Sequence, residues 1–118
     1  MRAPKINRSA VVRTANRIKW QVESVSVAFK KAWETEKKRM KMSVSVIQVV
    51  FLKKDGTIAF RHATRNPELI PVEKQPKKVS EYLGGTALPY FDVDKGEWRS
   101  FCVSGIITSD EVDQMFVK

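Results

Sequence analysis

The change in hydrophobic period near Ser43 constrains the fold of this 118-residue chain more than any other feature. Residues 5–42 contain neither proline nor glycine, and their apolar side chains recur at three- and four-residue steps, which is the helical period. From Ser43 onward, β-branched residues form short runs that Gly and Pro interrupt. A sequence with the helical period does not form a stable strand, and a sequence with the strand period does not form a stable helix. The sequence therefore predicts a helical segment at residues 1–42 and a β unit at residues 43–118.

The helical segment is expected to contain two helices. One apolar stripe belongs to the first helix: Val11, Val12, Ala15, Ile18 and Val22. Ser9 is a suitable N-cap for it, and Ser26 is a suitable N-cap for the second helix, with Val25 as a hydrophobic staple. The β-branched and serine-rich run at residues 22–27 favours a break near Ser24 over the alternative of one long helix.

The β unit is expected to contain five short antiparallel strands: Val44–Leu52, Thr57–Thr64, Leu88–Val93, Glu97–Val103 and Ile106–Ile107. Asp55 and Gly56 form a hairpin turn signal between the first two strands. Prolines at 67, 71 and 76 forbid a continuous strand, so residues 66–80 are predicted to be a loop. A short turn is expected at Val79–Leu83, and Ser109 is expected to cap a final helical turn. Short curved strands broken by Gly and Pro favour a small barrel over a sandwich.

The positive charge is segregated along the chain. The formal net charge is +9; residues 1–42 hold 12 Lys and Arg against 3 Glu, whereas residues 43–118 hold 10 basic and 10 acidic residues. Such an asymmetry concerns partners rather than fold, and it favours a polyanion. Nucleic acid, either DNA or RNA, and an acidic protein face are the partners that fit.

Nothing in the sequence predicts catalysis, a metal site or a cofactor. His62 is the only histidine and Cys102 the only cysteine, so neither a disulfide nor metal-ligand spacing is available. No serine or acid is tied to His62 by a recognisable motif, and Gly84-Gly85 lacks the spacing of a phosphate-binding loop. The N-terminus is polar and resembles no signal peptide. We expect a non-enzymatic cytoplasmic protein without membrane association.

Two stretches resemble a known family. The first runs from "FLKKDGTI" at Phe51–Ile58 to "TRNPELIP" at Thr64–Pro71, and the second is "FDVDKGEWRSF" at Phe91–Phe101. In this order and separation they resemble a WYL-like family of Sm/SH3-type β-barrels of bacteria and phages, over about residues 46–108. The resemblance implies a Sm-like SH3 barrel. Together with the helical period of residues 1–42 and the five expected strands, we expect an α+β fold in which one or two helices pack on a five-stranded antiparallel SH3/Sm-like barrel. It also implies recognition of anionic ligands, such as nucleotides or pieces of nucleic acid.

The barrel offers one candidate contact site, composed of Arg61, Arg65, Trp98 and Arg99. Alternation along the strand places Arg99 with Phe101 and opposite to Trp98. Arg99 would then lie at a barrel rim, where its guanidinium could hold a phosphate, and Trp98 could stack on a base. In the alternative interpretation, Trp98 covers the outer barrel face under the helices and Arg99 pairs with Asp92 or Asp94.

The basic helical segment offers a second candidate site for nucleic acid: Arg13, Arg17, Lys30, Lys37, Lys38, Arg39 and Lys41. Phosphate contacts by these side chains would make binding strongly dependent on salt. The alternative is a solvated helix face that keeps a small protein soluble.

The leading functional hypothesis is a nucleic-acid-associated accessory protein of low sequence specificity. Residues 26–37 are also similar to a helix of small phage and mobile-element proteins, which indicates a phage or mobile-element origin. If the protein is phage-encoded, it is expected in the host cytoplasm. Two alternatives stay open: a module that docks on an acidic host protein, and a sensor that binds a small anionic ligand in the barrel. Under each of these hypotheses the protein could form a homo-oligomer.

Overall fold

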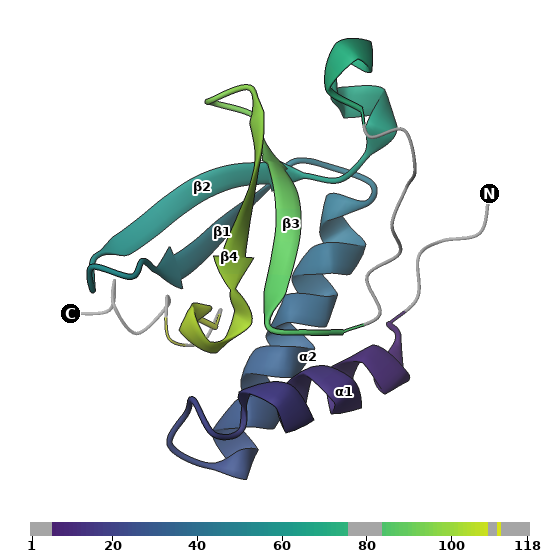
Figure 1. The fold of residues 1–118 in the computed structure, drawn as a ribbon. Helices are drawn as coiled ribbons and strands as arrows, with labels where there is room; N and C mark the ends of the chain where they lie inside the picture. The colour runs from purple at the N-terminus through teal and green to yellow at the C-terminus, as the bar shows by residue number, and fades with distance from the viewer. Residues whose placement is uncertain (1–5, 76–83, 109–110, 112–118) are drawn as a thin grey trace.

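The computed structural model describes residues 6–75, 84–108 and 111. Two helices precede four strands and three short 3-10 helices in this part of the chain (Figure 1): α1 (Arg8–Ile18), α2 (Val25–Met42), β1 (Ile47–Leu52), β2 (Ile58–Thr64), η1 (Pro67–Leu69), η2 (Val72–Lys74), β3 (Ala87–Asp92), β4 (Glu97–Cys102) and η3 (Val103–Gly105). The predicted α+β class is therefore confirmed. No helix among the described residues is long and apolar enough to cross a membrane.

The predicted break between two helices is confirmed, although both N-caps lie two residues earlier than expected. Asn7, not Ser9, caps α1, because its side chain accepts the N–H of Ala10 at 3.1 Å. Ser24, not Ser26, caps α2 and accepts the N–H of Val27 at 3.2 Å. Each cap has extended backbone angles, which allow its side chain to turn back onto the first helical turn.

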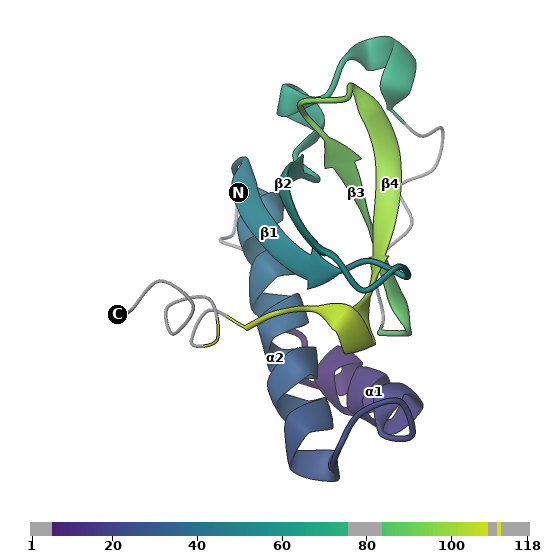
Figure 2. The same cartoon turned by 90° about the vertical axis from the view of Figure 1, so that its left-hand side faces the viewer.

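The two helices bury their apolar stripes against each other and against η3. Their shared core consists of small and β-branched side chains, which let the helix backbones approach closely: Val11, Ala15, Ile18, Ala28, Ala32 and Val103. Figures 1 and 2 show α1 lying across the N-terminal half of α2, while the C-terminal half of α2 runs beside β1.

The sheet is antiparallel with the order β1-β2-β3-β4, and it consists of two hairpins joined at a narrow contact. Six residue pairs link β1 to β2 and six link β3 to β4. In contrast, β2 and β3 share only two pairs, Ala63 with Asp92 and Thr64 with Phe91. The two hairpins therefore separate beyond this joint, which leaves space between them.

The chain after β4 returns to β1 and closes the barrel, but it does so with less strand than expected. Phe51 and Ile106 form a single antiparallel bridge, and the N–H of Ile107 donates to the carbonyl of Val50 at 2.9 Å. The 3-10 helix η3 begins at Val103, the residue predicted to end the fourth strand. It extends to Gly105, so only Ile106 and Ile107 remain to pair with β1. The sheet accordingly has four strands among the described residues, and the SH3/Sm-like architecture is retained.

Three aromatic rings form the centre of the barrel core. The rings of Phe51 and Phe101 stack with centroids 5.4 Å apart, and Tyr90 meets Phe51 edge-on at 6.4 Å. Met42 at the end of α2 is fully buried in the same cluster, together with Leu88. The barrel core therefore includes the end of α2, which explains why the helices and the strands form one unit.

The predicted hairpin turn at Asp55-Gly56 is confirmed. Gly56 has a φ of 88°, a left-handed conformation that glycine adopts at little cost. The Asp55 carboxylate accepts the hydroxyl and the backbone N–H of Thr57 at 2.6 and 2.9 Å. These two hydrogen bonds, the hydroxyl's first, lower the pKa of Asp55.

The proline-rich segment is a loop, as predicted, and its described part contains η1 and η2. Asn66 caps η1 by accepting the N–H of Glu68 at 3.0 Å. The turn expected at Val79–Leu83 lies outside the described residues. Of the predicted final helical turn, only Glu111 is described, and it is helical.

Gly84 is expected to tolerate no side chain, because it touches α1 closely. A Cβ placed there would lie 2.7 Å from the carbonyl oxygen of Ala10, and its φ of 101° is unfavourable for other residues. We expect Gly84→Ala to lower the free energy of unfolding by roughly 2 to 4 kcal/mol, measured by chemical denaturation. Gly56→Ala is the matched control, since nothing lies within 4 Å of its Cβ position. It should cost only about 1 kcal/mol. Equal losses for the two variants would contradict the close contact with α1.

Candidate anion-binding pocket at the barrel rim

A pocket of about 380 Å³ lies between the two hairpins and is lined by residues of both. The buried rings of Phe51, Tyr90 and Phe101 form its apolar base. Four cations line it, two from the turn after β1 and one each from β2 and β4: Lys53, Lys54, Arg61 and Arg99. No carboxylate is among the described lining residues.

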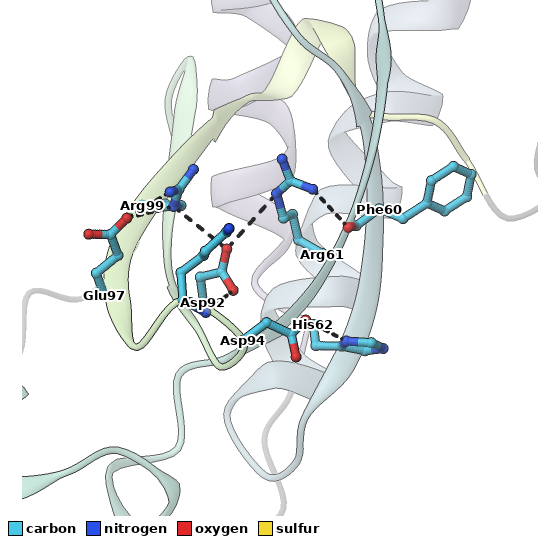
Figure 3. A network of polar contacts seen from close by, with 8 residues as sticks. Phe60, Arg61, His62, Asp92, Asp94, Glu97 and Arg99 are labelled. Carbon is cyan, nitrogen blue, oxygen red and sulfur yellow. Dashed lines mark hydrogen bonds and ion pairs between the residues drawn. The ribbon is translucent and has the colours of Figure 1, made fainter.

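A buried carboxylate behind this pocket holds both arginines. Asp92 at the end of β3 is fully buried, and its Oδ2 lies 3.9 Å from Nε of Arg61 and 3.6 Å from Nε of Arg99. Figure 3 shows Asp92 between the two guanidinium groups. Its Oδ1 accepts the N–H of Lys95 at 3.1 Å, whereas Oδ2 has no hydrogen bond within the described chain. A buried charge of this kind requires the nearby cations, so Asp92 fixes where the arginines lie.

Each arginine has a second contact that limits its movement. Arg99 donates through Nη2 and Nε to Oε1 of Glu97 at 2.7 and 3.1 Å, and this hydrogen bonding is the main reason that the pKa of Arg99 is raised. Arg61 donates through Nη1 to the carbonyl of Phe60 at 3.1 Å. Within the described part of the chain, Nη1 of Arg99 and Nη2 of Arg61 have no hydrogen-bond partner. The two groups are thus positioned in advance to bind an anion.

The phenol of Tyr90 stays protonated at neutral pH. Burial raises its pKa above the ordinary value of 10.0, and the charge of Asp92 raises it further, while Arg61 and Arg99 lower it. The pocket therefore gains no negative charge from this residue under physiological conditions.

The structure brings together only two of the four residues predicted for the barrel site. Arg61 and Arg99 meet in the pocket, as the sheet register allows. Arg65 does not belong to it, because it lies past the end of β2, where its N–H donates to the carbonyl of Met42 at 2.8 Å. The predicted alternative for Arg99 also occurs, since the Arg99–Asp92 ion pair is present.

Trp98 lies away from the pocket, on the other face of β4. Its Nε1 donates to the carbonyl of Lys74 at 2.7 Å, and its ring meets Phe91 edge-on at 5.9 Å. The expectation that Trp98 lies under the helices is therefore wrong. Trp98 contacts the loop that carries η2 instead, which sequence alternation could not show.

Sequence reasoning missed both lysines that line the pocket and the role of Asp92 behind it. Lys53 and Lys54 were visible only as part of a hairpin turn, and Asp92 only as a possible partner of Arg99. A basic pair next to a turn and an acid at a strand end are common, so neither pattern points to a pocket without knowledge of the strand register.

The predicted cations of the helical segment divide into two groups. Two of them are engaged with acids of their own helix: Arg39 donates to Oε1 of buried Glu36 at 2.5 and 2.9 Å, and Lys38 lies 3.8 Å from Glu34. The remaining five are exposed: Arg13, Arg17, Lys30, Lys37 and Lys41. The first two belong to α1 and the last three to α2, so the exposed charge occupies two helices rather than one continuous segment.

No cluster of metal-ligating residues occurs in the described ranges. His62 pairs with Asp94 at 2.8 Å, and both side chains are more than half exposed. Cys102 is a free and exposed thiol at the pocket edge.

Comparison with known proteins gives one family and one informative relative. Residues 35–107 match the family WYL_2, described as having an Sm-like SH3 beta-barrel fold. An uncharacterized 11.5 kDa protein from the Gp31-cd intergenic region of Enterobacteria phage T4 is 36% identical over an alignment of 73 residues, which covers 59% of this chain and 71% of the relative. No solved structure matches the chain.

Removal of the Asp92 charge should lower both the pKa of Tyr90 and the stability of the fold. A nearby negative charge disfavours the phenolate, so Asp92→Asn is expected to make Tyr90 ionise at a lower pH, measured by NMR titration. The free energy of unfolding should fall by about 1 to 3 kcal/mol, because Arg61 and Arg99 then lack their shared buried partner.

Asp94→Asn is the matched control for this prediction. The Asp94 side chain is 62% exposed, and its surface pair with His62 is expected to be worth less than about 1 kcal/mol. If Asp92→Asn changed the Tyr90 titration no more than Asp94→Asn does, the proposed anchoring role of Asp92 would be wrong.

Proposed function

Because the chain belongs to the WYL_2 family of Sm-like SH3 β-barrels, which has a relative in phage T4, we propose that it is a non-enzymatic, phage-type accessory protein that binds nucleic acid. The barrel pocket would hold backbone phosphates between Arg61, Arg99 and the Lys53-Lys54 pair. The exposed cations of α1 and α2 would add contacts that do not depend on sequence.

The observation that carries this proposal is the convergence of four cations on a pocket without a lining carboxylate. Each guanidinium keeps one nitrogen without a described partner, Nη1 of Arg99 and Nη2 of Arg61, which can donate a charge-assisted hydrogen bond to a phosphate oxygen, and the lysines add point charge. Asp92 and Glu97 already hold the arginines, so binding requires little ordering of these side chains.

The aromatic residues of the pocket argue for low sequence specificity. Stacking on a base requires an exposed ring face, whereas Phe51, Tyr90 and Phe101 are at most 8% exposed. Trp98 has a partly exposed ring, but it lies on the other face of β4. The pocket is therefore suited to read phosphate charge and not the identity of a base.

A small anionic ligand is a second candidate, favoured by the size of the pocket. A volume of about 380 Å³ lies within the range of small-molecule sites, and its base is apolar. A free nucleotide would contact the same pocket cations as a nucleic-acid backbone. The two ligands differ in size, because most of a nucleic-acid chain would lie outside the pocket. Only a longer chain could also reach the helical cations.

Loss of pocket charge should weaken the binding of a mixed-sequence, single-stranded 20-nucleotide DNA and of its RNA counterpart, measured by fluorescence anisotropy at low salt. We expect Arg99→Gln to raise Kd about tenfold, because a charge-assisted hydrogen bond is lost. Lys54→Gln, which removes no contact to a buried group, should raise Kd several-fold. Each variant should reduce the slope of log Kd against log salt by about one.

Lys74→Gln is the matched control, because Lys74 is exposed beside Trp98 and does not line the pocket. It should leave the salt slope unchanged. Binding that Arg99→Gln and Lys54→Gln both leave intact would contradict the pocket as the phosphate site. If a mononucleotide bound as tightly as the 20-mer, the small-ligand candidate would be favoured. If an acidic protein partner remained bound after nuclease treatment, the host-protein alternative would be favoured.

A further inference from the structure

One side of α1 exposes basic and polar side chains along the whole helix. The exposed positions fall within one half of the helix circumference and include Arg8, Val12, Arg13, Asn16 and Arg17. Residues 6–22 contain four Lys and Arg but no Asp or Glu, so this side has positive charge without an acid of its own. An open hollow of about 490 Å³ is lined by Arg8, Val12, Arg13 and Asn16. A phosphate backbone can therefore lie along α1 beside its cations.

The turn after α1 adds an exposed aromatic ring to this side. Trp20 is 85% exposed, and no other large apolar side chain in the described ranges is as exposed. It is held in a turn in which the N–H of Gln21 donates to the carbonyl of Ile18 at 2.8 Å. Nζ of Lys19 lies 5.2 Å from the centroid of the Trp20 ring, which is a cation–π distance. We call the exposed side chains of α1, together with Lys19 and Trp20, the α1 stripe.

The position of Trp20 leaves its ring accessible to a large ligand. Figure 1 shows the turn between α1 and α2 at the opposite end of the molecule from η1 and η2. An indole gains much from contact with another apolar or aromatic surface, so an indole left in water is available to a partner.

The α1 stripe has the two features with which proteins bind single-stranded nucleic acid. Cations contact the backbone, and an exposed aromatic ring stacks on a base. A base within a duplex is already stacked on its neighbours, whereas a base in a single strand has a free face. The rings of the barrel pocket are buried and cannot serve this purpose, so Trp20 supplies what the pocket lacks.

A membrane surface fits the α1 stripe less well than nucleic acid does. A helix that lies on a membrane presents an apolar face to the lipid. The exposed side of α1 has Val12 as its one aliphatic residue, and arginine, serine and asparagine fill the other positions. Charge with one terminal ring therefore favours a polyanion that carries aromatic groups.

We propose that the α1 stripe is a second nucleic-acid site, selective for single strands. Arg8 and Arg17 bind backbone phosphates, and an unpaired base stacks on the ring of Trp20. Because stacking accepts every base, the site adds a preference for single strands and not for a sequence. The proposal rests on the proposed function for its class of ligand, but it uses no residue of the barrel pocket.

The test is fluorescence anisotropy of the full chain at low salt with three labelled DNA ligands of equal length. They are a mixed-sequence single strand of 20 nucleotides, its duplex, and a strand of 20 abasic units that has the phosphates without the bases. Trp20→Ala should raise Kd for the base-bearing single strand about tenfold and leave Kd for the other two ligands unchanged. It should also leave the slope of log Kd against log salt unchanged, because no charge is removed. Trp20→Phe, which keeps a ring, should recover most of the affinity.

Two further variants separate stacking from charge and from general loss of apolar surface. Arg17→Gln should weaken the base-bearing and the abasic single strands alike and reduce the salt slope by about one. Val72→Ala is the matched control, because it removes an apolar side chain that is 82% exposed on η2. It should leave all three Kd values unchanged. Trp20→Ala should keep the thermal unfolding midpoint of the wild type, since the ring is mostly in water.

Four results would overturn the proposal. Equal weakening of the base-bearing and abasic strands by Trp20→Ala would show that its ring does not stack on bases. An unchanged Kd in Trp20→Ala, with weaker binding in Arg99→Gln, would remove the α1 stripe and leave the barrel pocket standing. No binding of any strand by the wild type would remove both sites. Quenching of Trp20 fluorescence by vesicles of phosphatidylserine and phosphatidylcholine, but not by the single strand, would assign the stripe to a membrane surface.

Discussion

Two residue pairs between β2 and β3 hold the molecule together. Ala63 pairs with Asp92 and Thr64 with Phe91, and the N–H of Val93 donates to the carbonyl of His62 at 3.0 Å beside these pairs. Thr64 is fully buried, and its hydroxyl donates toward the carbonyls of Met42 and Ser45 at 3.1 and 3.0 Å. The same joint thus ties the end of α2 to the sheet. It also places Asp92 where its carboxylate faces Arg61 and Arg99, so fold and pocket share one origin.

The distribution of charge in space differs from its distribution along the chain. All the excess charge lies in residues 1–42, yet the four cations that line the barrel pocket lie in the part of the chain that is neutral overall. Several N-terminal cations have structural contacts instead: Arg39 with buried Glu36, Lys38 with Glu34, and Lys31 with the carbonyl of Ile106. Net charge is therefore a weak guide to a binding site, because a site depends on which charges are held close together.

The two surfaces of interest belong to different parts of the chain. The barrel pocket lies within the family domain, which begins at residue 35, whereas the α1 stripe lies before it. The pocket is a cationic rim over buried rings, and the stripe ends at an exposed ring. The family match begins within α2, so part of the helical segment belongs to the matched region, and the helices are joined to the barrel through Met42 and Val103.

Local signals in the sequence determined the helices, the break between them, the Asp55-Gly56 hairpin and the antiparallel strands. Each depends on residues within a few positions of one another, whose period, capping or turn preference is readable directly. The tertiary structure decided that Arg61 and Arg99, 38 positions apart, share Asp92, that Lys53 and Lys54 join them, and that Trp98 donates a hydrogen bond to η2. These contacts depend on the short β2–β3 register and on the curvature it allows. The β2–β3 register and the curvature leave no local pattern in the sequence, because both arise from how separate elements pack against one another.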